Sequence, residues 1–172
     1  EGFGLPAAAP GQAPARMAQW LDELARLHQG QAGLKPYANA AAVAERLRQN
    51  NPRLPADKAQ WLAGHWAQPD GQGLWRVLGD PAHKVISPYL FRLEETLAAY
   101  RAITAPVLAA HALDEKGRDS LGLLWRGQYT LAEYLERMRS VPDCRIEAVQ
   151  GAGHMLHHDQ PQAVARLMES FL

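Results

Sequence analysis

Two short apolar runs in the second half of the chain set the strongest limit on its fold. Residues 106–112 and 144–149 each have the length of a buried strand, and the pattern Thr130-x-x-Glu133 between them is a capping box that opens a helix. Another helix is expected from about Pro161. This alternation predicts an α/β fold in which two parallel strands end at the same edge of a sheet. Two strands alone leave open edges, so we expect further strands from an upstream segment.

Helical periodicity dominates the first hundred residues. Helices are expected up to Gly30, then up to Pro52, and again from Pro55. Ser87 is a favourable N-cap and Pro88 a favourable first helical residue, so a fourth helix is expected to begin there. The apolar stripe of the first helix comprises Met17, Trp20, Leu21, Leu24 and Leu27. The last helix of the chain is expected to bury Val164, Leu167, Met168 and Phe171.

Composition narrows the class of protein. Hydrophobic residues make up 47% of the 172 residues, enough for a folded core. Lys+Arg and Asp+Glu both count 18, so the net charge is zero and neither nucleic acid nor an anionic membrane is expected as a partner. No apolar run has the length of a bilayer span. Cys144 is the only cysteine, which predicts a reducing, cytoplasmic location.

The segment that follows the second apolar run carries a histidine suited to proton transfer. His154 comes directly after Gly151-Ala152-Gly153, and imidazole can take and return a proton near neutral pH. Gly153-His154, then four residues, then Asp159-Gln160-Pro161 and an apolar helix resembles the catalytic-histidine segment of the α/β-hydrolase family. The resemblance implies that His154 is the general base of a nucleophile–His–acid triad.

The same resemblance extends over nearly the whole chain and implies its division. Glu1-Gly2-Phe3-Gly4 is similar to the end of the strand before the family's helical cap. Residues 1–104 are therefore expected to form a cap or lid region, of which residues 1–6 leave a core strand. Residues 105–172 are expected to be the C-terminal portion of the hydrolase core. The N-terminal portion of the same protein is thus an expected partner, together with a small-molecule substrate.

The resemblance implies that Asp114, in the loop after the first apolar run, is the acid of the triad. Such a carboxylate holds the histidine tautomer and stabilises the imidazolium. A carboxylate that only caps its own loop is the alternative role. The chain also departs from the family pattern, because no glycine stands at residues 111–113. Glu115 and Asp119 are close enough to substitute, and Glu1 is a further alternative, because many haloalkane dehalogenases place the acid after the strand before the cap.

The family's nucleophile is absent from these 172 residues. A G-x-S-x-G elbow would present the nucleophilic serine, and no serine here is flanked in that way. None of the serines Ser87, Ser120, Ser140 and Ser170, nor the thiol of Cys144, stands in such an elbow. The nucleophile and the oxyanion hole are therefore expected from outside this chain. A serine would imply cleavage of an ester, thioester, amide or carbon–carbon bond, and an aspartate would imply halide displacement or epoxide opening.

Three other features have competing explanations. His157, His158 and Asp159 near His154 do not fit a zinc helix motif, because Gly153 and Pro161 interrupt the helix, and no metal or cofactor is expected. The tryptophans of the cap either line an apolar substrate pocket or pack its helices; they are Trp20, Trp61, Trp66 and Trp75. The rival to a hydrolase is a non-catalytic helical binding module in which the histidine is a relic.

Overall fold

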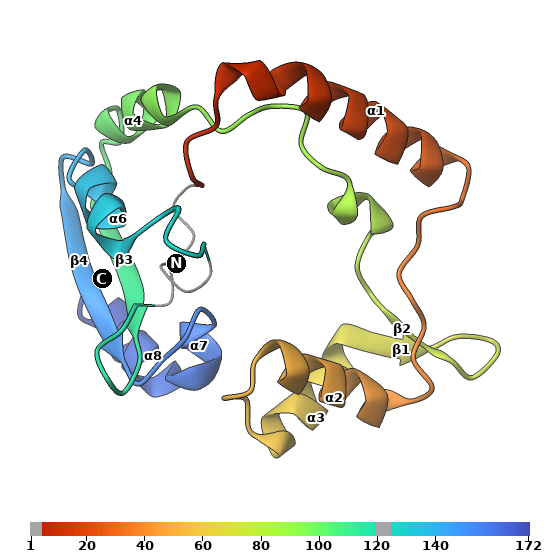
Figure 1. Cartoon of the computed structure of the whole chain (residues 1–172). Helices are drawn as coiled ribbons and strands as arrows, with labels where there is room; N and C mark the ends of the chain where they lie inside the picture. The colour runs from red at the N-terminus through yellow and green to blue at the C-terminus, as the bar shows by residue number, and fades with distance from the viewer. Residues whose placement is uncertain (1–4, 120–124) are drawn as a thin grey trace. The chain divides into compact units, whose positions relative to one another are not determined.

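The computed structural model describes residues 5–119 and 125–172. The chain forms two compact units (Figure 1). One is Ala9–Leu90, and the other joins the residues up to Ala8 with Phe91–Leu172. The units therefore change at residues 90–91, whereas the sequence placed the change at residues 104–105. The helix α4 (Leu93–Arg101) and its neighbours belong to the second unit because Tyr100 and Ile103 pack against its core. That the first unit acts as a lid stays a prediction.

The unit Ala9–Leu90 is mainly helical. It contains η1 (Pro10–Gln12), α1 (Ala13–His28), α2 (Ala40–Asn50), α3 (Ala56–Trp66), the hairpin β1 (Ala67–Pro69) and β2 (Trp75–Val77), and η2 (Pro81–Lys84). The Asn39 side chain caps α2 by accepting a hydrogen bond from the Ala42 amide at 2.9 Å. Small residues let α2 and α3 approach closely, and the core comprises Val43, Ala44, Leu54, Ala59, Ala63 and Ala67.

The second unit is built on two parallel strands, as the sequence predicted. β3 (Val107–Leu113) pairs with β4 (Cys144–Gln150) from Val107↔Cys144 to Leu113↔Gln150. Side chains of alternate residues point to opposite faces, so Ala109 joins one core and Ala112 the other. The helix α6 (Leu131–Met138) covers the first face, and α8 (Pro161–Glu169) covers the second after the short α7 (Leu156–Asp159).

The predicted start of α6 is confirmed, with one difference in its cap. The Thr130 hydroxyl accepts a hydrogen bond from the Glu133 amide at 3.3 Å, as expected of an N-cap. The Glu133 side chain, however, pairs with Arg137 one turn later. Tyr134 and Met138 on this helix are buried. Within the described ranges, no helix combines the length and the apolar character needed to cross a membrane.

Two predictions about helices are wrong. The fourth helix begins at Leu93 and not at Ser87-Pro88, because the Ser87 hydroxyl accepts the Tyr89 amide in a local turn at 3.3 Å. The Ile86 amide just before it is held by the Glu23 carboxylate at 2.8 Å. In the last helix, Met168 is 55% exposed.

The apolar stripe predicted for the first helix is real, but α1 buries none of its side chains. Met17 is 42% exposed and Leu21 is 53% exposed, while Trp20, Leu24 and Leu27 are half-buried.

Candidate active site

The carboxyl edge of the two-stranded sheet is where the predicted site residues gather. Because β3 and β4 run parallel, the loops that follow them leave the sheet on the same side. The Ala152 amide donates to the Leu113 carbonyl at 3.0 Å, which ties the loop after β4 to the last residue of β3. The Asp114 loop and the His154 loop therefore start beside each other. The chemical roles of the two residues stay predictions.

The Asp114 carboxylate is held by its own loop. One oxygen, Oδ1, accepts the amides of Lys116 and Arg118, both at 2.8 Å. The other, Oδ2, accepts the Arg118 guanidinium at 2.7 Å. The Gly117 amide closes the turn by donating to the Asp114 carbonyl at 2.9 Å, with a φ of 73° at Gly117 that favours glycine. This is the loop-capping role that the sequence left as the alternative.

These hydrogen bonds fix the charge of the carboxyl group. The amide and guanidinium of Arg118, followed by the Lys116 amide, lower the pKa of Asp114 from 3.8 to about 2. The side chain is 11% exposed, yet it is ionised at neutral pH. An ionised carboxylate is the form that a triad needs to stabilise an imidazolium.

The His154 loop is braced from the segment behind it. The Asp159 carboxylate accepts the Gly153 amide at 2.8 Å, and the Gln160 side chain donates to the Gly151 carbonyl at 3.1 Å. Gly151 has a φ of 65°, and a Cβ there would lie 3.1 Å from the Gln160 amide nitrogen. The backbone on both sides of Ala152 is thereby fixed, and the His154 side chain is left exposed.

Asp159 and Gln160 are supporting residues that sequence reasoning did not assign. Their positions were recognised only as part of the motif after the histidine. The signal was their spacing from Gly151 and Gly153, since side-chain amides and carboxylates commonly satisfy the backbone groups of such loops.

The alternative acids differ in what the structure says of them. Glu115 is exposed, one residue beyond Asp114 in the same turn. Asp119 is half-buried and pairs its backbone with Leu113 in an antiparallel bridge. Glu1 lies outside the described residues. Asp114 is the best placed of the described carboxylates, because it follows β3 directly.

The groups weighed as nucleophiles show no activated geometry in the described part of the chain. The Ser170 hydroxyl donates to the Leu167 carbonyl at 2.9 Å, as in many helix ends. Burial raises the pKa of the Cys144 thiol, which is the opposite of what a thiolate nucleophile needs. Ser120 lies outside the described residues.

In residues 5–119 and 125–172, no three His, Cys, Asp or Glu side chains lie together in a group that could hold a metal ion. The rings of His157 and His158 lie 4.3 Å apart beside the candidate site.

The tryptophans predicted as pocket residues all belong to the helical unit. Trp61 is 65% exposed and meets the His65 ring edge-on at 4.3 Å, and Trp66 is 41% exposed. Trp75 packs against the core of that unit, and Trp20 is half-buried. A cavity of about 250 Å³ in the same unit is lined by none of these tryptophans but by Glu23, Arg26, Gln31, Ala32, Pro81, Lys84 and Val85. A substrate role for the tryptophans stays a prediction.

Comparison with known proteins identifies the family of the chain. The model of the Alpha/beta hydrolase family matches residues 3–167. No curated protein sequence matches the chain.

Solved structures resemble the chain at low sequence identity. E-2-(acetamidomethylene)succinate hydrolase is 22% identical, with a TM-score of 0.61, over 90% of this chain and 52% of its own. The thioesterase domain from the curacin biosynthetic pathway is 21% identical, with a TM-score of 0.69, over 96% of this chain and 53% of its own. An esterase of Mycobacterium tuberculosis is 17% identical, with a TM-score of 0.62, over 96% of this chain and 52% of its own. These likenesses show the fold, and the chain spans about half the length of each structure.

Proposed function

The chain belongs to the alpha/beta hydrolase family, and from this premise we propose that it supplies the lid and the acid–base half of a hydrolase active site. In this proposal His154 is the general base and Asp114 is its acid partner. The nucleophile and the oxyanion hole come from outside these 172 residues. The substrate is a small, largely apolar ester or a related compound, and no cofactor takes part.

The observation that carries the proposal is the meeting of the two loops at one sheet edge. The hydrogen bond from the Ala152 amide to the Leu113 carbonyl joins the chain next to Asp114 to the chain that leads to His154. An exposed imidazole on a braced loop is suited to take a proton from a nucleophile and return it to a leaving group. The carboxylate of Asp114 is ionised and so can stabilise the imidazolium formed in between.

The bond cleaved depends on the nucleophile. A serine would attack an acyl carbon, and an aspartate would displace a halide or open an epoxide. Two of the similar structures are an esterase and a thioesterase domain, so acyl esters and thioesters are the first substrates to assay. The single cysteine supports a reducing compartment such as the cytoplasm.

The experiment compares the 172-residue chain alone with the same chain expressed in frame with its upstream coding segment. Both are assayed with p-nitrophenyl butyrate and titrated for a burst of product. We expect turnover only when a nucleophile elbow is present, and none after His154→Ala. A stoichiometric burst from the chain alone would overturn the missing-nucleophile part. Full activity of His154→Ala in the longer protein would overturn the proposal and favour a binding module.

A further inference from the structure

Arg137 on α6 is a buried charged side chain that the proposed chemistry does not use. It is 3% exposed, and it contacts Leu5 and Phe91, which stand on either side of the segment Ala9–Leu90 in the sequence. The chain leaves the α/β unit after Ala8 and returns to it at Phe91. The outgoing connection, residues 5–8, and the returning residue Phe91 both belong to the α/β unit.

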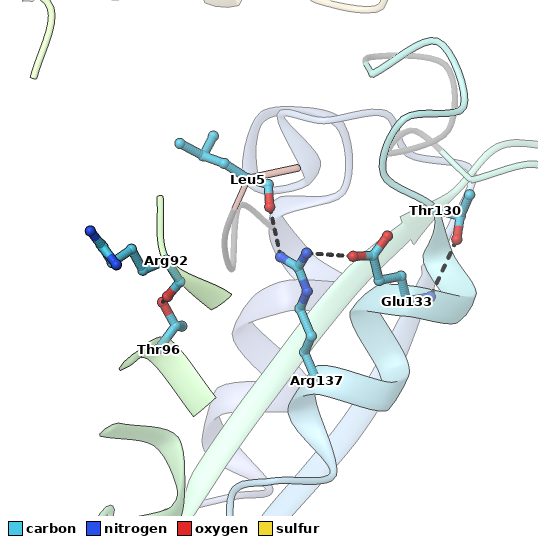
Figure 2. Close-up of polar contacts among 6 residues, drawn as sticks. All are labelled: Leu5, Arg92, Thr96, Thr130, Glu133 and Arg137. Atoms are coloured by element: carbon cyan, nitrogen blue, oxygen red, sulfur yellow. Dashed lines mark hydrogen bonds and ion pairs between the residues drawn. The ribbon is translucent and has the colours of Figure 1, made fainter. Parts of the chain in front are cut away.

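The guanidinium of Arg137 contacts both connections, and Figure 2 shows its hydrogen bond to the outgoing one at Leu5. One terminal nitrogen donates to the Leu5 carbonyl at 2.8 Å, across 132 residues of sequence. The other terminal nitrogen pairs with the Glu133 carboxylate on the same helix. The central carbon of the group, Cζ, lies over the Tyr129 ring at 4.3 Å from its centre and over the Phe91 ring at 5.2 Å from its centre.

The connections also contact each other. The Ala8 amide donates to the Phe91 carbonyl at 3.5 Å, a long hydrogen bond that is weak by itself. The Leu5 carbonyl precedes Pro6, which has no amide hydrogen, so this stretch cannot form a regular ladder. Without a ladder partner, the Leu5 carbonyl needs another donor, and Arg137 supplies one.

Burial of an arginine is costly unless its charge is compensated. An apolar residue of similar size would fill the same place between α6 and the two connections without that cost. The planar guanidinium can donate to a carbonyl and a carboxylate along its edge while its face lies on aromatic rings. This combination suits a group that must hold two separate backbone segments on one helix.

We propose that Arg137 is a positioning residue that clamps both connections to the helical unit onto α6. The clamp keeps residues 5–8 and Phe91 with the α/β unit, so that movement of the helical unit begins beyond these residues. Its consequence for substrate access rests on the proposed lid function, whereas the clamp itself does not.

The test is amide hydrogen exchange of the full chain, resolved by residue with NMR. Arg137→Met replaces the arginine with an apolar side chain of similar length and so removes its hydrogen bonds. We expect the Ala8 amide to exchange roughly tenfold faster, the effect of losing one hydrogen bond to a charged group. Amides of β3 and β4 should keep their wild-type rates. Arg137→Lys, which retains a charge and a donor, should fall between the two.

Arg139→Gln is the matched control, because Arg139 stands two residues later at the end of the same helix, is 69% exposed and pairs at the surface with Glu136. It should leave the Ala8 rate unchanged. If the β3 and β4 amides of Arg137→Met lose their protection from exchange, the variant is not folded, and Phe91→Leu is used for the test instead. That variant removes one ring from the returning connection and should also speed exchange at Ala8. The clamp would be overturned if Arg137→Met is folded and its Ala8 amide exchanges at the wild-type rate. If Arg137→Met is not folded, the same result for a folded Phe91→Leu would overturn it. Neither result depends on the hydrolase assays.

Discussion

The same turn is built twice in this molecule, once in each compact unit. At Asp70, between β1 and β2, Oδ1 accepts the amides of Gln72 and Leu74 at 2.9 and 3.0 Å, and Oδ2 accepts the Arg76 guanidinium at 2.6 Å. At Asp114 the corresponding donors are the amides two and four residues later and the guanidinium of Arg118. Each turn also has a glycine three residues after the aspartate, with φ of 77° and 73°.

What differs is the surroundings of each turn. The Asp70 turn ends a two-stranded hairpin in the helical unit. The Asp114 turn follows a strand of the parallel sheet, beside the loop that leads to His154. Local geometry therefore identifies a turn-capping aspartate in both places and assigns chemistry to neither. The position of Asp114 at the sheet edge is the reason to expect a second role, and the matched turn at Asp70 provides a control for it.

The largest expected effect separates the two aspartates by activity. In the hydrolase with its nucleophile, Asp114→Asn should lower kcat by roughly 10⁴-fold, because a neutral amide cannot stabilise the imidazolium and can favour the wrong tautomer. Asp70→Asn should change kcat less than about twofold, since it alters the same kind of turn in the unit that does not carry His154. Steady-state kinetics with an acyl ester measures both.

Equal kcat values for the two variants would leave Asp114 with the loop-capping role alone. If Glu1→Gln, Glu115→Gln or Asp119→Asn is inactive instead, the acid belongs to that residue.

A smaller effect is expected from the brace of the His154 loop. Asp159→Ala removes the acceptor of the Gly153 amide, and a displaced base should lower kcat by roughly 10- to 100-fold with little change in KM. Asp159→Asn keeps a carbonyl oxygen as acceptor and should lose less. Wild-type kcat in a folded Asp159→Ala protein would mean that the loop does not need this brace.

Acid stability should reveal the turns themselves. The pKa of Asp114 is lowered from 3.8 to about 2, so its carboxylate stabilises the fold above pH 3.8 and loses this contribution as the pH falls toward 2. Hydrogen bonds from Arg76 and from the Gln72 amide likewise lower the pKa of Asp70. Urea unfolding midpoints should therefore fall more steeply with acid in the wild type than in Asp114→Asn or Asp70→Asn. Parallel profiles would contradict the bonding described for these carboxylates.

The smallest effects are expected at the neighbouring histidines. His157→Ala and His158→Ala should each change kcat by less than about threefold, because neither stands at the base position of the motif. If either variant loses as much kcat as Asp114→Asn, the general base is that histidine and not His154. The same steady-state assay applies, with circular dichroism to confirm that each variant is folded.

The sequence predicts the sheet well, because its strands and α6 carry local signals. Apolar runs placed both ends of β3 and of β4 to within one residue, and Thr130 marked the start of α6. The start of α4 was missed because Ser87 has the residue type of a helix N-cap, whereas its hydroxyl accepts the Tyr89 amide in a local turn.

The meeting of the Asp114 and His154 loops was predictable from the sequence, but the hydrogen bonds of these loops were not. Order along the chain and the parallel pairing are enough to bring the two loops to one edge. The hydrogen bonds between the Asp114 carboxylate and Arg118 depend on the geometry of the turn. The sequence carries a signal for this turn, a glycine three residues after the aspartate, at Asp70–Gly73 and again at Asp114–Gly117. The exposure of Met168 shows a further limit, because periodicity finds an apolar face but not what covers it.

The most direct test of the account is a double-mutant cycle between the two loops in the hydrolase with its nucleophile. His154→Ala, Asp114→Asn and the double variant are compared by kcat for one acyl ester. If Asp114 acts through His154, the double variant should be no slower than His154→Ala alone, since the carboxylate has no imidazolium left to stabilise. If the two losses multiply, Asp114 does not act through His154, and the pairing at the centre of the proposed site is wrong.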